Sequence, residues 1–206
     1  MPDRIVLGFD TSAAHCAAAL LRGDRVIGAR HEAMAKGQAE RLMPMLEEML
    51  SDAGLGWRDL DVLGVGTGPG NFTGIRVGVA AARGLALALR IPAIGIGAPE
   101  ALAWGLPRPC RVIIPGKGDL VIWQDFHDPQ GSSGPQDTAP ESRPQQAATG
   151  SLAPGPAPAA PALGIAEGVA RLAALRSRTP QPRPAPVYLR PADAAPARDA
   201  PPVILS

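Results

Sequence analysis

Apolar positions in the first half of the chain follow two different spacings, one typical of strands and one typical of helices. Residues 5–9 are continuously apolar and end at Asp10-Thr11-Ser12, which predicts a buried strand that opens into a turn. Residues 17–21 and 26–29 flank a turn at Gly23 and predict a hairpin. Residues 39–53 carry one apolar stripe at helical spacing, and Pro44 inside it predicts that the regular helix begins there.

The same alternation continues through a glycine-rich loop. Residues 61–66 predict a second buried strand, residues 75–90 predict a helix that Pro92 stops, and residues 93–96 predict a further strand. The order βββαβαβ predicts an α/β protein with the ribonuclease H-like or actin-like (ASKHA) fold. We assign residues 1–105 to this first lobe.

The second half of the chain has a different composition. Of 24 prolines in 206 residues, 19 follow residue 106. Residues 112–114 and 120–123 predict a hairpin, and residues 165–175 predict a short helix. Residues 131–162 hold one large apolar residue, Leu152, and we expect them to form a disordered insertion. We therefore assign residues 106–206 to a reduced second lobe.

Charge and cysteine content exclude several classes of protein. The net charge of +1 provides no overall positive potential that would attract nucleic acid or an acidic membrane. No apolar run is long enough to span a bilayer. Two cysteines, Cys16 and Cys110, make neither a disulfide framework nor a four-ligand zinc site. The N-terminus lacks the pattern of a signal peptide. We expect a cytoplasmic chain without a metal or a membrane contact.

The loop at residues 68–74 is the strongest candidate for chemistry. A glycine-rich turn before a helix exposes backbone N–H groups that suit a phosphate. No Lys-Ser/Thr follows its last glycine, so it is not a P-loop, and a tight strand-to-helix turn without a ligand explains it equally well. If a nucleotide or phosphate binds, the contacts expected are Asp10, Thr11, Gly68, Gly70, Thr73 and Arg76. In that case the chain would be a small actin-like ATPase or a small-molecule kinase.

No catalytic constellation is visible elsewhere. The three histidines, His15, His31 and His127, are scattered, and Ala35 stands where a zinc-protease motif beginning at His31 needs its second ligand. A nuclease of this fold needs several converging carboxylates. The strand at residues 61–66 is followed by Thr67 and Gly68, so no carboxylate stands at its end. We expect neither a catalytic residue nor a metal site.

Two helical stripes could be either core or a subunit interface. One is apolar and rich in methionine, and the other repeats small residues at every fourth position. The residues expected at a partner interface are Leu42, Met43, Leu46, Met49, Leu50, Gly74, Gly78 and Ala82.

Several motifs resemble the TsaB family, whose members support synthesis of N6-threonylcarbamoyladenosine in tRNA. The strongest is G-P-G-N-F-T-G-I-R at residues 68–76, and the similarity covers residues 4–105 strongly and 187–191 weakly. The related TsaD family carries an H-x-E-x-H metal motif, and this chain has Ala98, Glu100 and Leu102 at the matching positions.

This resemblance implies a non-catalytic partner subunit. It would pair with TsaD through the two helices and with the ATPase TsaE, and would support modification next to the anticodon of ANN-decoding tRNAs. It implies no cofactor on this chain by itself, with ATP or ADP and the metal on the partner subunits. Because the chain has no surplus of basic residues, we expect only indirect contact with tRNA. A homodimer through the same helical stripe is a further possibility when the chain is alone.

Overall fold

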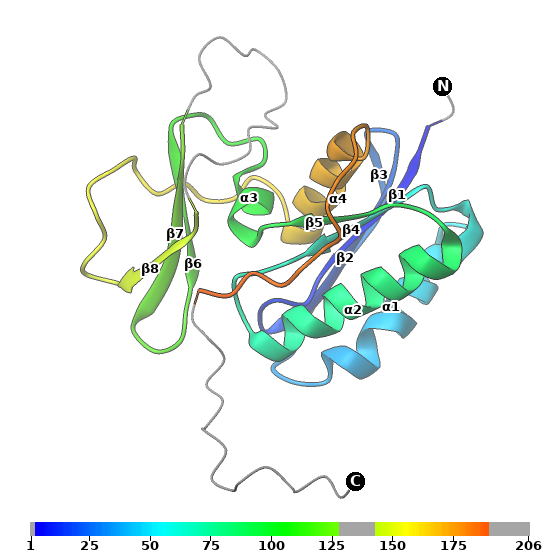
Figure 1. Cartoon of the computed structure of the whole chain (residues 1–206), viewed down its shortest axis with the longest axis horizontal. Helices are drawn as coiled ribbons and strands as arrows, with labels where there is room; N and C mark the ends of the chain where they lie inside the picture. Colours follow the sequence, from blue (N-terminus) through cyan, green and yellow to red (C-terminus); the bar gives the residue numbers. More distant parts are fainter. Residues whose placement is uncertain (1–2, 128–142, 190–206) are drawn as a thin grey trace, which may run out of the picture.

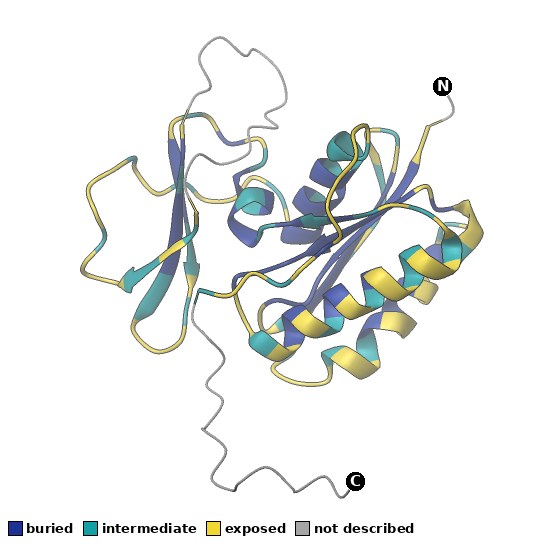
Figure 2. Cartoon of the chain, in the orientation of Figure 1, coloured by how far each residue is buried: buried dark blue, intermediate teal, exposed yellow. Residues whose placement is uncertain are grey.

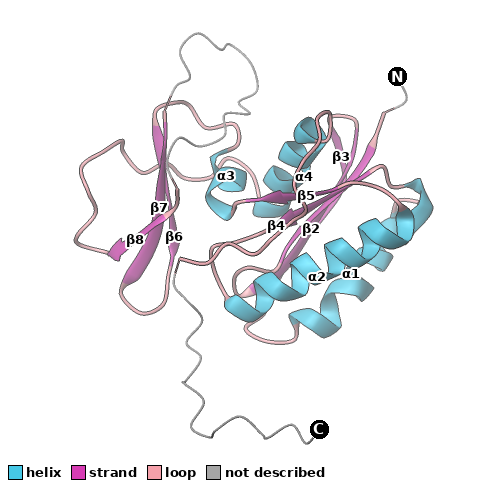
Figure 3. Ribbon diagram, in the orientation of Figure 1, coloured by secondary structure: helices cyan, strands magenta, loops and turns pink. Residues whose placement is uncertain are grey.

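The computed structural model describes residues 3–127 and 143–189 of the chain. Two sheets and four helices form two unequal lobes (Figures 1 and 3). The first sheet contains β1 (Ile5–Asp10), β2 (His15–Arg22), β3 (Arg25–Ala33), β4 (Val62–Gly66) and β5 (Ala93–Ile96). The second sheet contains β6 (Cys110–Pro115), β7 (Leu120–Phe126) and β8 (Gln145–Ala148). The helices are α1 (Gln38–Asp52), α2 (Phe72–Leu89), α3 (Ala98–Ala103) and α4 (Ile165–Arg176), with a 3-10 turn, η1 (Trp57–Asp59).

The first sheet has the order β3-β2-β1-β4-β5. β1, β2 and β3 pair antiparallel, whereas β1–β4 and β4–β5 pair parallel. Three meandering strands followed by parallel strands joined through helices form the ribonuclease H-like, actin-like fold, as the sequence pattern predicts. The second sheet is antiparallel throughout, and the predicted hairpin is its β6–β7 pair.

Both faces of the first sheet are buried, because its central strands are apolar on both sides. On β1, Ile5, Leu7 and Phe9 pack beneath α1 and α2, whereas Val6 packs against α4 on the opposite face. α1 and α2 lie side by side on their face (Figure 1). This two-sided burial explains why the strand reads as a continuous apolar run.

α4 packs on the first sheet although it lies in the second half of the sequence. It comes so close that a Cβ at Gly8 would lie 2.6 Å from Ala170 Cβ, and one at Gly64 would lie 2.8 Å from Ala173 Cβ. The expected assignment of residues 106–206 to a second lobe therefore needs correction. The second lobe is the sheet β6–β7–β8 with its loops, and α4 belongs to the first.

Part of the expected disordered insertion has a defined structure. Residues 131–142 lie outside the described residues, but residues 143–162 contain β8 and a loop that Arg111 holds. The Arg111 guanidinium donates to the Ala153 carbonyl oxygen at 2.6 Å. The backbone carbonyl oxygen of Arg111 accepts from Ala159 N–H at 2.9 Å. Backbone hydrogen bonds, rather than apolar burial, order this stretch, so a count of apolar residues does not detect it.

Two helix boundaries also differ from prediction. α1 begins at Gln38, six residues before Pro44, and contains the proline inside its second turn. α3 was not predicted, because its six residues are too few to show a helical period. The helix predicted at 165–175 is confirmed as α4.

Candidate functional site

The turn after β1 is organised around the buried carboxylate of Asp10. Its Oδ1 accepts hydrogen bonds from the backbone N–H and the hydroxyl of Ser12, both at 2.9 Å, and lies 2.7 Å from His15 Nε2. Its Oδ2 has no hydrogen-bond partner in the described parts of the chain and lies against Gly66, where a Cβ would overlap it. Asp10 therefore fixes the shape of its own turn.

The glycine-rich loop at residues 68–74 packs directly on that turn. Asn71 N–H donates to the Ser12 carbonyl oxygen at 2.6 Å, and the Thr11 hydroxyl donates to the Gly74 carbonyl oxygen at 2.7 Å. A Cβ at Gly70 would overlap the Ser12 carbonyl oxygen, and a Cβ at Gly74 would overlap that of Thr11. Both positions therefore need glycine because two backbone segments touch there.

This geometry disfavours the predicted phosphate site. Carbonyl oxygens of residues 11 and 12 face the loop, and they would repel a phosphate rather than bind it. Asp10 and Thr11 are buried, whereas Thr73 and Arg76 are exposed on the first turns of α2. The Asn71 side chain accepts from Gly74 N–H at 3.0 Å and caps the helix from within the chain. Of the two alternatives, the tight turn without a ligand fits the structure better than an ATPase or kinase site.

Glu100 has a structural role in this chain. One of its oxygens, Oε2, accepts from Gly97 N–H at 3.0 Å at the start of α3, and Oε1 lies 3.1 Å from an Arg176 nitrogen on α4. Ala98 and Leu102 are apolar neighbours on the same helix. Within residues 3–127 and 143–189, no three His, Cys, Asp or Glu side chains gather in a way that could hold a metal ion.

Most of the predicted partner interface is instead the core of this chain. Seven of the eight predicted residues are buried, namely Leu42, Leu46, Met49, Leu50, Gly74, Gly78 and Ala82. The remaining residue, Met43, is 38% exposed. The buried residues form the core of this chain, because an amphipathic helix turns its apolar stripe toward its own sheet, and Met43 is the member of the set that a partner could contact directly.

The outer face of α2 carries apolar and small residues beside the exposed Arg83, and it has no cover in the described chain. The side of α2 that faces away from the sheet carries many exposed residues (Figure 2). Ala80, Gly84 and Leu87 are exposed and share one side of the helix, and Leu87 is 82% exposed. With both faces apolar, α2 has the length and composition of a membrane-crossing helix. Core helices of soluble proteins pass the same test, and Ile75, Val79 and Ala82 pack on the sheet. We define Ala80, Gly84 and Leu87 as the outer face of α2.

A cluster of one arginine and two aromatic rings joins α2 to the last described segment. The Arg76 guanidinium carbon lies 3.7 Å from the centre of the Phe72 ring, and Arg76 Nε donates to the Tyr188 hydroxyl at 2.9 Å. The Phe72 and Tyr188 rings are 4.8 Å apart. Val187 N–H donates to the Thr67 carbonyl oxygen at 2.9 Å and holds the segment beside the sheet. Sequence analysis missed this cluster, because Arg76 and Tyr188 are 112 residues apart in the chain.

Ion pairs link α1 to the edge strand β3. Arg41 donates to Glu32 and to Glu48 at 2.7 Å, and Arg30 donates to Glu48 at 2.5 Å. The guanidinium groups of Arg41 and, to a smaller extent, Arg30 lower the pKa of Glu48 to about 2. The network fixes α1 against β3.

A cleft of about 1370 Å³ separates the two lobes. The turn after β1, the start of α2, helix α3 and residues 187–189 form one wall, and the β6–β7 hairpin forms the other. The His15 and His31 rings, 4.9 Å apart, lie at its edge.

The comparisons with known proteins agree with this architecture. The family model for TsaD, tRNA N6-adenosine threonylcarbamoyltransferase, matches residues 27–130, which is half of the chain. The chain belongs to this family. The match covers β3 through β7 and so includes the loop 68–74 and both helices of that face.

Among the family's members, the chain is similar to TsaB proteins. It is 32% identical over 126 residues to TsaB of Escherichia coli K12, covering 59% of this chain and 54% of that protein. It is 39% identical over 104 residues to TsaB of Haemophilus influenzae, covering 50% of this chain and 43% of that protein. The chain thus spans about half the length of the curated relatives it matches. These matches confirm the resemblance to TsaB that the motifs indicate.

A solved structure extends the similarity over both lobes. A Pseudomonas aeruginosa protein described as similar to the peptidase YeaZ superposes with a TM-score of 0.74 at 25% identity. The alignment covers 91% of this chain and all of the other. The actin-like fold class is therefore confirmed.

Proposed function

We propose that this TsaD-family chain is a non-catalytic partner subunit in the synthesis of N6-threonylcarbamoyladenosine. In this proposal it heterodimerises with TsaD, assembles with TsaE, and supports modification next to the anticodon of ANN-decoding tRNAs. The observation that carries the proposal is the outer face of α2, which is apolar and exposed beside a helix whose own apolar stripe is buried.

The chemistry of that face suits a second helical protein. Ala80 and Gly84 are small and allow a partner helix to approach closely, and Leu87 offers a large apolar side chain at 82% exposure. Met43 of α1, which is 38% exposed, adds a flexible apolar contact on the neighbouring helix. Contiguous exposed apolar patches rimmed by polar residues mark protein interfaces.

Charged side chains frame the same face. Arg83 is exposed on α2, and Glu40 and Glu47 are exposed on α1. An apolar centre with a polar rim is the usual anatomy of a protein interface. Such a rim would set the orientation of a partner more than its affinity.

Three features support a role without chemistry of its own. Ala98 and Leu102 stand where the TsaD motif has its metal-binding histidines. Glu100 bonds to Gly97 and Arg176 instead of a metal. The carbonyl oxygens of residues 11 and 12 pack against the loop at residues 68–74. We therefore place ATP or ADP and the metal on the partner subunits, with tRNA contact through them. A homodimer through the same face of α2 would form when TsaD is absent, and tRNA modification would locate the chain in the cytoplasm.

A reconstituted modification reaction tests this proposal. TsaD and TsaE from the same organism, with their small-molecule substrates and an ANN-decoding tRNA, should form little modified adenosine until this chain is added. The Leu87→Glu variant should fail to stimulate the reaction, whereas Ala160→Glu, at an exposed position in the second lobe, should stimulate it fully. Equal product with and without the chain would contradict the proposal.

A further inference from the structure

The cleft between the lobes has a chemistry that partner binding does not use. Its volume of about 1370 Å³ exceeds the roughly 300–1,000 Å³ of common small-molecule sites. Large apolar side chains line both walls, among them Leu102, Ile114, Ile122, Leu163, Ile165 and Leu189. Burial of the apolar part of a ligand against walls of this kind favours binding.

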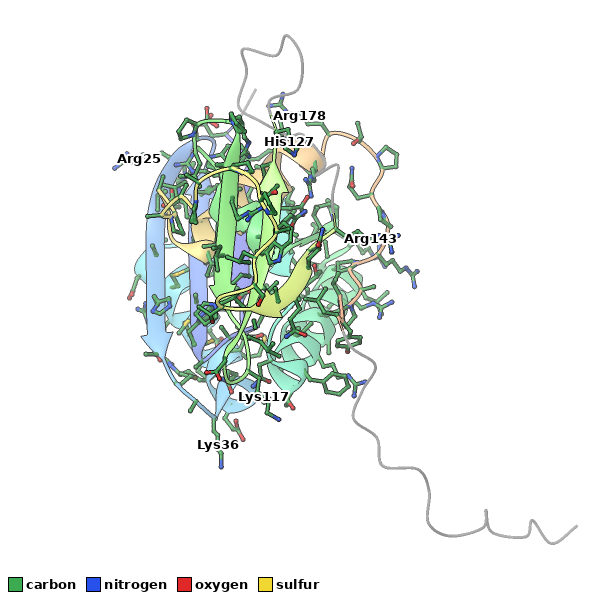
Figure 4. All side chains as sticks on the ribbon, turned by 90° about the vertical axis from the view of Figure 1, so that its left-hand side faces the viewer. Arg25, Lys36, Lys117, His127, Arg143 and Arg178 are labelled. Carbon is green, nitrogen blue, oxygen red and sulfur yellow. The ribbon has the colours of Figure 1, made fainter. Side chains whose placement is uncertain are left out.

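Apart from the phenol of Tyr188, the ionisable side chains that line the cleft are all basic. They are His15, His31, Arg76 and Lys117, and no carboxylate lines the cleft in the described chain. Lys117 stands at the tip of the β6–β7 turn (Figure 4). Arg76 lies on α2 in the other lobe. Asp10, the carboxylate behind His15, is fully buried and bonded within its own turn.

Arg76 and Lys117 have no ion-pair partner in the parts of the chain that the structure describes. Arg76 is held in place by the Phe72 ring and, through Nε, by the Tyr188 hydroxyl, and within residues 3–127 and 143–189 its two terminal nitrogens have no hydrogen-bond partner. A guanidinium fixed in this way is pre-organised for a carboxylate, because little side-chain freedom remains to be lost.

We infer that the cleft binds an organic anion with an apolar body and a single acidic group. The acidic group lies at Arg76, Lys117 adds positive charge from the opposite wall, and the body lies against the apolar walls. A nucleotide fits less well, because its phosphates need N–H donors where this chain presents carbonyl oxygens, and its Mg²⁺ needs carboxylates that the cleft lacks. This inference goes beyond the partner role and does not depend on it.

The fluorescent anion anilinonaphthalene sulfonate is a suitable probe for the isolated full-length chain. We expect one binding site per chain, with an affinity that falls as salt rises, because the acidic group meets exposed cations. The double variant Arg76→Gln/Lys117→Gln should weaken binding about tenfold or more, as expected for charge-assisted contacts. The matched double variant Lys36→Gln/Arg58→Gln removes one lysine and one arginine at exposed positions outside the cleft, and should bind like the unaltered chain.

A neutral dye, Nile red, separates charge from apolar burial. It should bind the unaltered chain and the cleft double variant with equal affinity, independently of salt. The inference is overturned if the anion binds both double variants equally, or if its binding to the unaltered chain is insensitive to salt. Displacement of the dye by ATP at micromolar concentration would also overturn it, because the cleft would then be a nucleotide site.

Discussion

Gly74 and Thr11 are joined so closely that each fixes the other's backbone. The Thr11 hydroxyl donates to the Gly74 carbonyl oxygen at 2.7 Å, and a Cβ at position 74 would overlap the Thr11 carbonyl oxygen. This contact locks the start of α2 onto the turn after β1. It explains the glycine motif by packing rather than by a ligand.

The first prediction concerns two glycines of α2 that differ in their surroundings. Gly74→Ala should lower the free energy of unfolding by about 3 kcal/mol or more, because the methyl group must displace backbone. Gly84→Ala should raise it by about 0.5–1 kcal/mol, since nothing lies within 4 Å and alanine favours the helix. Urea unfolding of both variants measures this. Equal effects at the two positions would contradict the packing explanation.

The second prediction distinguishes the inner and outer faces of the two helices. Leu46→Glu should lower the free energy of unfolding by several kcal/mol, about 3 or more, because a fully buried leucine becomes an unpaired charge. Leu87→Glu should change it by less than about 0.5 kcal/mol, because the side chain is 82% exposed. Thermal unfolding of the isolated chain measures both. A stable, folded Leu46→Glu variant would show that the stripe on α1 is not core.

The third prediction concerns acid stability through Glu48. Arg41 and Arg30 lower its pKa from 4.5 to about 2, so its ion pairs stabilise the fold above pH 4.5. That contribution is lost as the pH falls toward 2. Glu48→Gln should therefore lower the Tm at neutral pH and leave it unchanged near pH 2, with a smaller effect in high salt. Glu47→Gln, an exposed neighbour outside these ion pairs, is the control. A Tm difference that is constant with pH would refute the assignment.

The fourth prediction concerns alkaline stability through Cys16. Burial, and next the charge of Glu32, raises the pKa of its thiol from 9.0 to about 11. The unfolded chain then loses this proton before the folded chain does, so stability falls as the pH rises from 9.0 to about 11. The loss should reach about 2 kcal/mol at the upper end of that range. Cys16→Ala should show a shallower decline of Tm with pH, and an unchanged slope would contradict the explanation.

The first sheet was predictable because its strands are short apolar runs bounded by glycine and acidic turns. β1 and β5 follow such runs, and the order of elements limits the topology to few choices. The position of α4 was not predictable. Its close approach depends on Ala170 lying against Gly8 and Ala173 lying against Gly64. These contacts exist only in the folded chain.

The helix stripes show a different limit of sequence analysis. The pattern at Leu42, Leu46 and Met49 correctly indicates an apolar face, but a period does not say what covers that face. α2 is apolar on both sides, so its exposed side at Leu87 carries no periodic signal of its own. The cluster of Phe72, Arg76 and Tyr188 was hidden for a similar reason, because only folding brings its residues together.

Complex formation with TsaD tests the central claim most directly. Size-exclusion chromatography with light scattering should show a complex when this chain and TsaD from the same organism are mixed at micromolar concentration. We predict that Leu87→Glu abolishes the complex while remaining folded, and that Ala160→Glu preserves it. Separate elution of the two unaltered proteins, or a complex that Leu87→Glu leaves intact, would contradict the account.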